Sequence, residues 1–400
     1  MRRRAALKLL GMGGALWGLA GSVARGRPAL GGGEARPEPV KLIGHRSLVF
    51  SAAFDREGAR IATGSLDQTL AIWDAATGLE RPTFYHDGPV YAVAFSPDGT
   101  RVASGAPGRR IEHDPPPMPP GQLVAPRRWG VNFHYEGGAI RLWDFETGRA
   151  AMTIGGLGYW PRALAFAADG RAIAALDIWD VFTLHDVGDG REICLLDGHR
   201  GQAQSGTSAT SAVAFTADAR RAVAIKTRAR KNHRGADEYR SALATWDVAT
   251  KRTRMIEPEG GTADSVALSP DGDRIAVGSH GGVLTLRDFE GGAVLRTIKF
   301  ETRGDPESYN SPYFLSFSPD GKRLAVARQN QPLTIHDGAT GALLQTIDSP
   351  PGVQKDVRAI AFGKGWVRVV TGGLDNTQER DPETGILKPE PLLVWQSPLD

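Results

Sequence analysis

Residues Val90–Gly99 read VYAVAFSPDG and continue as TRVAS at Thr100–Ser104, and this stretch decides how the chain folds. A nearly continuous apolar run ends in Pro-Asp-Gly, and a second apolar run follows. Asp-Gly between two such runs is a strong hairpin signal, because the turn needs a positive φ that glycine adopts at little cost. The stretch therefore predicts two short, buried, antiparallel strands.

The same phrase recurs along the chain, which makes it a repeat unit. Further copies lie at Ala52–Gly58, Ala163–Gly170, Ala212–Ala219, Val266–Gly272, Leu315–Gly321 and, in degraded form, Ala359–Gly365. Each copy is followed by a second recurrent motif, an apolar strand that ends in Trp-Asp or a related pair. Leu70-Ala-Ile-Trp-Asp74 is typical, and most of these motifs lead into a Gly-containing turn and another strand. Each unit is thus expected to hold four short strands, at a spacing of roughly 41 to 49 residues where no insertion intervenes.

Seven such units in series resemble the WD40-repeat family, and the resemblance covers Val40 to Gln396. It implies a β-propeller in which a His, a Ser or Thr, an Asp and a Trp brace a blade by hydrogen bonds. This tetrad is complete only in the first unit, as His45, Thr63, Asp67 and Trp73. The last unit keeps Thr371, Asp375 and Trp395, whereas the fifth and sixth units lack both the His and the Trp.

The ends of the repeat array predict how the ring closes. The last unit stops after its third strand, and the first unit is preceded by a spare strand at Pro39–Ile43. If that strand completes the last blade, no sheet edge is left unpaired. The expected fold is all-β: a seven-bladed β-propeller of four-stranded antiparallel blades, closed by the N-terminal strand. Six or eight blades would require one miscounted unit.

The first residues are expected to form a targeting signal rather than part of the fold. Residues 1–26 combine an arginine run with a short, Gly-rich apolar stretch and a plausible cleavage site. Arg3-Arg4-Ala5-Ala6-Leu7-Lys8 resembles the twin-arginine export signal; an ordinary secretory signal and an uncleaved anchor are the alternatives. Residues 27–39 read as a flexible lead-in, and 40–400 as the propeller. This organisation predicts an exported, periplasmic or extracytoplasmic protein.

Charge and cysteine content exclude several classes. The formal net charge is +3, but four positive charges lie in the first eight residues, so the rest of the chain is nearly neutral. The basic pI is therefore no argument for nucleic-acid binding. The single cysteine, Cys194, excludes an intramolecular disulfide and a cysteine metal cluster. No cofactor and no metal site are expected.

Every substantial insertion falls in the connections between strands two and three or between neighbouring units. The longest are Ala106–Gly137, Thr227–Arg240 and Gly372–Glu390. Two further insertions, Gly201–Thr210 and Glu301–Ser311, lengthen the connections that lead into the fourth and sixth units. Propeller strands alternate in direction, so all five insertions are expected on one face. Insertions on one face of a repeat protein often mark its binding face. The alternative is that surface loops simply tolerate extra length.

Two of these insertions are locally basic and supply the candidate binding residues. These are Arg109, Arg110, His113, Arg127, Arg128, Trp129, Arg228, Arg230, Lys231 and Arg234. Arginine suits bidentate recognition of carboxylate or phosphate, and aromatic side chains supply contact area. An acidic peptide or an anionic glycan is thus a reasonable partner. The alternative is that the insertions are solvated loops without a ligand.

No catalytic signature is present in the sequence: it contains no Gly-x-Ser-x-Gly, His-Glu-x-x-His or phosphate-loop motif. The expected function is therefore a non-catalytic interaction scaffold that docks a protein or anionic ligand on its loop-rich face. The competing hypothesis is an enzyme or small-molecule binder that uses the mouth of the central channel. The sequence leaves the partner and the oligomeric state open.

Overall fold

The computed structural model describes most of the repeat region. The described residues are 38–112, 133–178, 181–196, 213–216, 218–231, 237–257, 262–279, 281–300, 312–328, 331–350, 357–372 and 391–399. Within these ranges, only the backbone is described for residues 109–110, 112, 133–136, 226–231 and 237–240. The described residues hold strands and turns and no α-helix.

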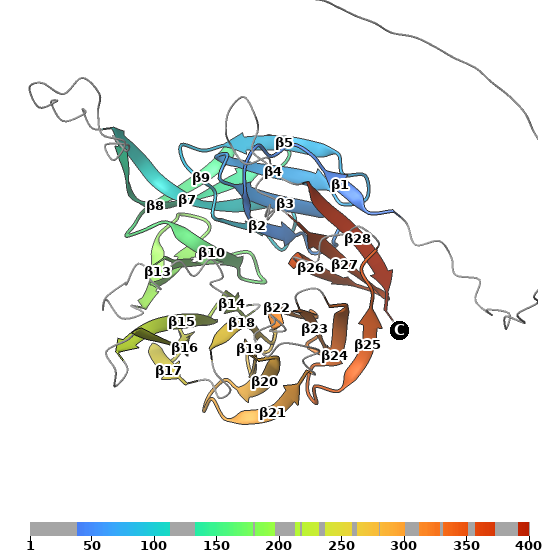
Figure 1. Cartoon of the computed structure of the whole chain (residues 1–400). Coiled ribbons are helices and arrows are strands. Elements are labelled where there is room, and N and C mark those ends of the chain that lie inside the picture. Colours follow the sequence, from blue (N-terminus) through green and yellow to red (C-terminus); the bar gives the residue numbers. More distant parts are fainter. Residues whose placement is uncertain are drawn as a thin grey trace, which may run out of the picture. The chain divides into compact units, whose positions relative to one another are not determined.

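The strands form seven four-stranded antiparallel sheets, which are the blades of a propeller (Figure 1). Blade 1 holds β2 (Val49–Phe54), β3 (Arg60–Ser65), β4 (Thr69–Asp74) and β5 (Glu80–Tyr85). Blade 2 holds β6 (Ala92–Phe95), β7 (Arg101–Glu112), β8 (Phe133–Asp144) and β9 (Ala150–Leu157). Blade 3 holds β10 (Pro161–Phe166), β11 (Ala172–Asp177), β12 (Phe182–Asp186) and β13 (Glu192–Leu196).

The remaining blades follow the same order. Blade 4 holds β14 (Val213–Phe215), β15 (Arg221–Lys231), β16 (Asp237–Asp247) and β17 (Arg252–Ile256). Blade 5 holds β18 (Ala263–Leu268), β19 (Arg274–Ser279), β20 (Val283–Asp288) and β21 (Val294–Lys299). Blade 6 holds β22 (Pro312–Phe317), β23 (Arg323–Arg328), β24 (Leu333–Asp337) and β25 (Leu343–Ile347). Blade 7 holds β26 (Val357–Gly363), β27 (Trp366–Thr371), β28 (Leu392–Pro398) and β1 (Val40–Leu42).

The core lies between the blades, and each pair of neighbouring blades shares one buried apolar cluster. Leu70 of blade 1, for example, shares a cluster with Val102 of blade 2. Five further clusters join blades 2 to 7 in order. The seventh contains Trp73 of blade 1 and Val370 of blade 7. The clusters form a closed cycle, which confirms the predicted all-β, seven-bladed propeller.

The N-terminal strand lies where the sequence predicts it. β1 pairs antiparallel with β28, with Val40 opposite Val394 and Leu42 opposite Leu392. The order β1-β28-β27-β26 gives blade 7 the same four strands as every other blade. This pairing is consistent with closure of the ring by the N-terminal strand.

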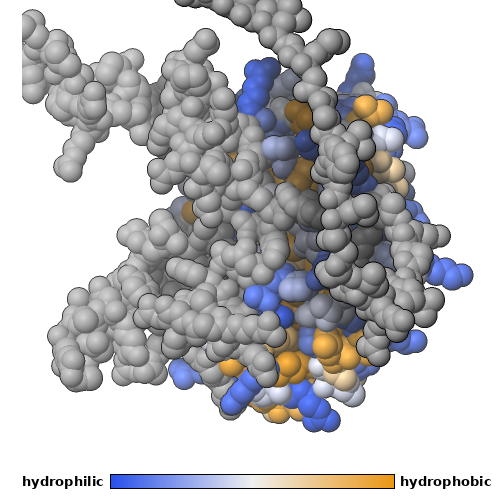
Figure 2. Space-filling view, turned by 45° about the vertical axis from the view of Figure 1, so that its right-hand side comes forward, coloured by the Kyte–Doolittle hydropathy of each residue, from blue (hydrophilic) through white to orange (hydrophobic). Residues whose placement is uncertain are grey.

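Burial within each blade is greatest in its two middle strands. The second and third strands are almost fully buried, as in β3 and β4 of blade 1. The fourth strands form the outer rim and expose apolar side chains such as Ile193, Leu195, Leu343 and Leu344. In the oblique view of Figure 2, the described surface mixes polar and apolar residues, with the apolar ones in small groups.

The recurrent turn between first and second strands is held by its own side chains. In blade 2 the hydroxyl of Ser96 donates to Asp98 at 2.5 Å and accepts the backbone N–H of Arg101 at 2.9 Å. Gly99 takes a φ of 68°, the left-handed value that favours glycine. Blade 4 places Ala219 there at 56°, so that turn carries the strain of a Cβ. The Ser-Pro-Asp-Gly phrase is thus the chemical reason for the predicted hairpin.

Candidate docking face

The two faces of the ring are defined by its connections. Because consecutive strands of a blade are antiparallel, the connections from strand two to three and from one blade to the next emerge on one face. We call this the insertion face, and the opposite one the turn face. The segments 113–132, 232–236 and 373–390 join second to third strands, and 197–212 and 301–311 join neighbouring blades. All five predicted insertions therefore begin and end on the insertion face.

The two basic insertions are not simple loops, which corrects the sequence-based interpretation. β7 and β8 remain paired as far as Glu112 opposite Phe133, and β15 and β16 as far as Lys231 opposite Asp237. β7 has 12 residues where β3 has 6, so this hairpin extends about 20 Å further at the usual rise per residue. Figure 1 shows both hairpins projecting from the ring. We call them the blade-2 ribbon and the blade-4 ribbon.

The strand pairing of the two ribbons includes half of the predicted binding residues. Arg109 and Arg110 lie in β7, and Arg228, Arg230 and Lys231 lie in β15. The other predicted residues, His113, Arg127, Arg128, Trp129 and Arg234, lie outside the described residues.

The register places an acidic residue opposite two of the arginines. Arg109 is opposite Glu136, and Arg230 is opposite Glu238. The blade-4 ribbon still carries five basic and two acidic residues over 227–240, whereas 106–137 carries four basic and three acidic ones. Positive charge is therefore concentrated on the blade-4 ribbon.

A second feature of the insertion face is a row of aromatic side chains at the inner ends of blades 1 to 3. The ring centroids of Phe50 and Tyr91 are 5.0 Å apart, and those of Tyr91 and Trp160 are 6.0 Å apart with nearly parallel planes. Phe50 lies in β2, and Tyr91 and Trp160 directly precede β6 and β10, the first strands of their blades. In Figure 1, β2 and β10 lie on the inner side of their blades. Three successive blades thus join their aromatic side chains into one continuous row.

A β-bulge explains how the side chain of Phe50 is presented. The pairing of first and second strands shifts register at Phe50, and again at Arg162 in blade 3 and Tyr313 in blade 6. A bulge inserts one extra residue and re-aims its side chain. The bulge side chain therefore departs from the alternation that buries its neighbours, and Phe50 is 40% exposed.

Other apolar side chains are exposed on the insertion face of blades 1 to 3, and Ile43 is exposed there directly after β1 of blade 7. We define the apolar arc as Ile43, Phe50, Leu66, Tyr85, Tyr91, Tyr159, Trp160 and Ile178. Tyr85 is 75% exposed and Ile43 is 71% exposed. The turn face has Leu79 as its one exposed large apolar residue in the described ranges, and the remaining ones lie on the outer rim. Large apolar side chains exposed on one face of a protein favour an interaction site on that face.

The predicted tetrad forms a connected hydrogen-bond chain in blade 1. The indole Nε1 of Trp73 donates to Thr63 Oγ1 at 2.7 Å, and Thr63 Oγ1 lies 2.6 Å from His45 Nε2. His45 Nδ1 lies 3.0 Å from Asp67 Oδ2. Burial alone raises the pKa of Asp67, but hydrogen bonds from His45, Thr69 and the Arg46 backbone hold that pKa well below its usual range.

The other blades keep only parts of this chain. In blade 2, Trp143 Nε1 donates to Ser104 Oγ at 2.8 Å, and His86 lies edge-on to the Trp143 ring. In blade 7, Trp395 Nε1 and Thr371 Oγ1 are buried without a hydrogen-bond partner among the described residues. Asp375 lies outside the described residues. Buried His185, Arg287 and His336 occupy the tryptophan position in blades 3, 5 and 6.

The described residues contain no group of three or more His, Cys, Asp or Glu that could hold a metal ion. Nor does this part of the chain contain a helix long and apolar enough to cross a membrane. Cys194 lies half-buried in β13, and burial raises the pKa of its thiol.

Sequence comparison matches residues 37–74 and 80–111 to the family "WD domain, G-beta repeat". Eukaryotic translation initiation factor 3 subunit I of Pyricularia oryzae is 37% identical over 70 residues, 18% of this chain and 20% of that protein. The serine-threonine kinase receptor-associated protein of Gallus gallus is 24% identical over 155 residues, 34% of this chain and 44% of that protein. Its Homo sapiens counterpart is 30% identical over 80 residues, 20% of this chain and 23% of that protein.

The matches to these curated relatives thus span less than half the length of each. The family match establishes that the chain contains WD40 repeats, and the sheet topology places them within a seven-bladed propeller. The apolar arc was missed at the level of sequence, because Phe50 and Tyr91 read there as ordinary strand residues. The signal that could have found it is an aromatic residue at the same place in the first two units, one or two positions before the first alanine of the strand.

Proposed function

We propose that this chain, a seven-bladed propeller with WD40 repeats, is a non-catalytic scaffold that docks a protein partner on its insertion face. The observation that carries the proposal is the apolar arc. Tyr and Trp are enriched among the residues that dominate binding energy at protein interfaces. Tyr91 and Trp160 supply such side chains, and Phe50 extends the aromatic row to a third blade.

The ribbons narrow the chemistry of the partner. The basic excess of the blade-4 ribbon favours a partner segment that carries acidic residues, since charge complementarity speeds encounter and suppresses wrong partners. The apolar arc favours apolar anchors in the same segment. The partner that fits both is a protein segment with apolar anchors and flanking acidic residues, rather than an anionic glycan.

The names of the relatives support a scaffold function in general terms. By their names, one is a subunit of a translation initiation factor and the other is associated with a receptor. Both names describe proteins that work together with other proteins. We transfer only that general character, because each match covers a minor part of both chains.

The test is affinity capture with the tagged full-length chain beside a variant in which residues 108–135 are replaced by a short Gly-Ser turn. The deletion removes the end of the blade-2 ribbon but keeps the part of β7 and β8 that pairs with β9. The parent should retain a partner that the variant loses while both unfold at the same temperature. Equal capture by both would contradict a role for this ribbon.

We further propose that residues 1–26 direct export, that 27–39 form a lead-in, and that the protein works outside the cytoplasm. The twin-arginine resemblance at Arg3 and Arg4 supports this. Changing both to lysine keeps the charge and removes the arginine pair, and it should leave the protein in the cytoplasmic fraction. Unchanged fractionation of this Arg3→Lys/Arg4→Lys variant would contradict the twin-arginine route.

A further inference from the structure

The β-bulge at the start of the first strand recurs around the ring and carries a different chemistry in different blades. In blades 1, 3, 5, 6 and 7 the pairing of first and second strands skips one residue, which we call the bulge residue. The bulge residues are Phe50, Arg162, Asp264, Tyr313 and Arg358. Because each first strand begins at the insertion face, the bulge residues lie at that end of their blades. Figure 1 shows β2, β10 and β26 on the inner side of their blades.

The bulge residue of one blade contacts the start of the first strand of the next blade. The rings of Phe50 in blade 1 and Tyr91 in blade 2 have centroids 5.0 Å apart. The hydroxyl of Tyr313 in blade 6 accepts the backbone N–H of Val357 in blade 7 at 2.8 Å. Neighbouring blades thus bring this part of their first strands together. Arg358 holds the bulge position in blade 7, which packs against blade 1 on its other side.

Two arginines therefore bound the aromatic row that Phe50 begins and Trp160 ends. Arg358 precedes the row in blade 7, and Arg162 follows Trp160 by two residues in blade 3. The acidic bulge residue, Asp264, belongs to blade 5, so one whole blade separates it from each arginine. The order from blade 7 to blade 3 is thus basic, aromatic, basic.

Each of the two arginines is held by a backbone carbonyl of its own blade. Arg162 Nε donates to the carbonyl of Asp177 at 3.1 Å, and Arg358 Nε donates to the carbonyl of Gly372 at 2.9 Å. Asp177 ends β11 and Gly372 directly follows β27, so both carbonyls lie at the insertion-face end of a second strand. Both arginines are partly exposed. A guanidinium is planar, and a bond at Nε fixes the plane in which it can pair with a carboxylate.

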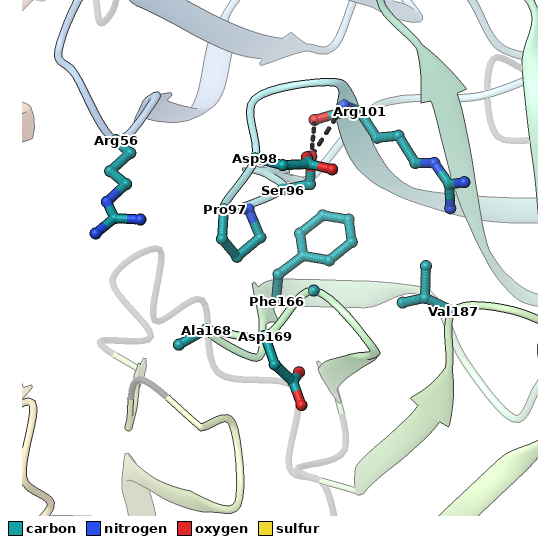
Figure 3. Close-up of a pocket in the computed structure, with 10 residues that line it drawn as sticks. Arg56, Ser96, Pro97, Asp98, Arg101, Phe166, Ala168, Asp169 and Val187 are labelled. Carbon is teal, nitrogen blue, oxygen red and sulfur yellow. Dashed lines mark hydrogen bonds between the residues drawn. The ribbon is translucent and has the colours of Figure 1, made fainter.

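The charged groups at a cavity of the turn face lack such an order. This cavity of about 350 Å³ lies between the first turns of blades 1 to 3 (Figure 3). Arg56, Arg101 and Asp169 lie on different sides of it, and the ring of Phe166 stands between Arg101 and Asp169. The insertion face, in contrast, arranges its basic and aromatic side chains in one sequence around the ring.

We propose that Arg162 and Arg358 bind the two ends of an extended partner segment that has an acidic residue at each end and apolar residues between them. The inference rests on the proposed docking function and adds the order and spacing of the partner's residues. Each carboxylate pairs with a guanidinium, with which it can form two parallel hydrogen bonds. The apolar residues pack against the aromatic row, whose Tyr and Trp side chains are of the kind that dominates binding at interfaces.

The geometry of the row sets the distance between the two acidic residues. Ring centroids of neighbouring members are 5.0 and 6.0 Å apart. Three such steps lead from the bulge of blade 7 to blade 3, about 16 Å along the row, and an extended chain that rises about 3.3 Å per residue covers this in about five residues. The acidic residues of the partner should therefore stand about five positions apart.

The test is calorimetric titration of the full-length chain with the capped peptide Gly-Asp-Ala-Leu-Phe-Leu-Asp-Gly as the probe. Saturable binding is expected. A rearranged peptide, Gly-Ala-Leu-Asp-Asp-Phe-Leu-Gly, has the same composition and charge but places both carboxylates in the middle. It should bind roughly tenfold more weakly or worse, as should a peptide with lysine in place of both aspartates. The rearranged peptide tests the order of the residues on the unaltered chain.

A double variant tests the two arginines directly. Arg162→Gln/Arg358→Gln should weaken binding of the probe by roughly tenfold or more. Arg296→Gln is the matched control, because Arg296 also donates to a backbone carbonyl, that of Leu295, but lies exposed in the outer strand β21. This control should bind the probe as the parent does. If the double variant fails to fold, the rearranged peptide still tests the proposal.

The proposal is overturned if the probe shows no saturable binding up to about 1 mM, the weak end of specific affinities. Equal binding of the rearranged peptide, or equal binding by the double variant, would overturn it as well. The docking function can survive that failure. A captured partner that the double arginine variant retains, but that Phe50→Ser/Tyr85→Ser/Tyr159→Ser loses, would support docking on the insertion face and refute the role of the two arginines.

Discussion

Within blade 1, the interior and the insertion-face end use similar side chains in opposite ways. Trp73 is fully buried and bonded through Thr63 to His45, whereas Tyr85 of the same blade is 75% exposed. The interior satisfies its polar groups internally, because an unpaired buried donor costs more than a hydrogen bond gains. The insertion face leaves large apolar surface in water. Stability and recognition are therefore expected to be separable, and substitutions can test that separation in order of effect.

The largest effect is expected from deletion of Val40–Leu42. These residues form β1, and Leu42 is 3% exposed within the cluster that joins blades 7 and 1. Without them β28 becomes an unpaired edge, so the ring should open and the cooperative unfolding transition should be lost. Circular dichroism during heating measures this, with Lys41→Ala, an exposed position, as the unchanged control. A deletion variant that melts like the parent would show that β1 does not close the ring.

Acidification should destabilise the interior next most strongly. Burial, helped by the nearby Arg141, lowers the pKa of His86 to about 3, and burial also lowers the pKa of His185 and His336. Below pH 6.5 these histidines bind protons in the unfolded chain but stay neutral in the folded one. The free energy of unfolding is therefore highest above that pH and falls as the pH is lowered toward 3. For His86 alone the loss reaches on the order of 4 kcal/mol. Urea denaturation at a series of pH values measures the slope.

His86→Gln separates this histidine from the rest. The variant keeps an acceptor for the Arg141 guanidinium, which donates to His86 Nδ1 at 3.2 Å, but it cannot titrate. Its stability should fall less steeply below pH 6.5 than that of the parent. An unchanged slope would mean that His86 does not contribute.

A matched pair of threonines tests the hydrogen-bond chain. Thr63→Val removes the partner of both Trp73 and His45 and should cost about 2–3 kcal/mol. Thr371→Val makes the same change in blade 7, where the hydroxyl has no partner among the described residues, and it should be near neutral. Urea unfolding of both variants measures the difference. Equal costs would show that the hydrogen bonds of Thr63 in blade 1 add no stability beyond that of burying the side chain.

Arginines that reach across the junction between two blades should contribute less. Arg274→Gln loses hydrogen bonds to the Gly338 and Gly321 carbonyls across the junction of blades 5 and 6, at an expected cost of about 1–2 kcal/mol. Arg101 begins β7 as Arg274 begins β19, but its side chain makes no hydrogen bond with a described residue, so Arg101→Gln should cost less. The same unfolding measurement applies, and equal losses at both positions would contradict a contribution from the hydrogen bonds of Arg274.

The smallest effect on stability is expected at the apolar arc. Phe50→Ser, Tyr85→Ser and Tyr159→Ser change residues that are 40%, 75% and 45% exposed. Exposed positions contribute little, so the triple variant should lose no more than about 1 kcal/mol. A larger loss in urea unfolding would mean that these residues serve the fold rather than a partner.

The fold was predictable because its signals are local and repeated. Three signals carry the prediction: the Pro-Asp-Gly turn, the Trp-Asp ending and the spare strand before the first unit. The first two recur in the successive units, so each copy supports the others. The tetrad geometry of His45, Thr63, Asp67 and Trp73 matches the arrangement that the family resemblance implies.

The candidate site was predictable only in outline. The sequence located the insertions on one face, but it read the ribbons as loops because a basic, Gly-containing segment carries no strand periodicity. Pairing of Arg230 opposite Glu238 appears only once the register is known. The exposure of Phe50 depends on a bulge, and the bridging role of Arg274 depends on the next blade. Such features arise from tertiary contacts and not from local pattern.

The most direct test of the scaffold proposal measures partner binding and unfolding together on two variants. One is the Phe50→Ser/Tyr85→Ser/Tyr159→Ser triple variant of the insertion face, and the other is Arg274→Gln of the turn face. The account predicts that the triple variant loses the captured partner with its unfolding midpoint nearly unchanged, whereas Arg274→Gln unfolds earlier and binds the partner fully. Retention of the partner by the triple variant would contradict docking on the insertion face.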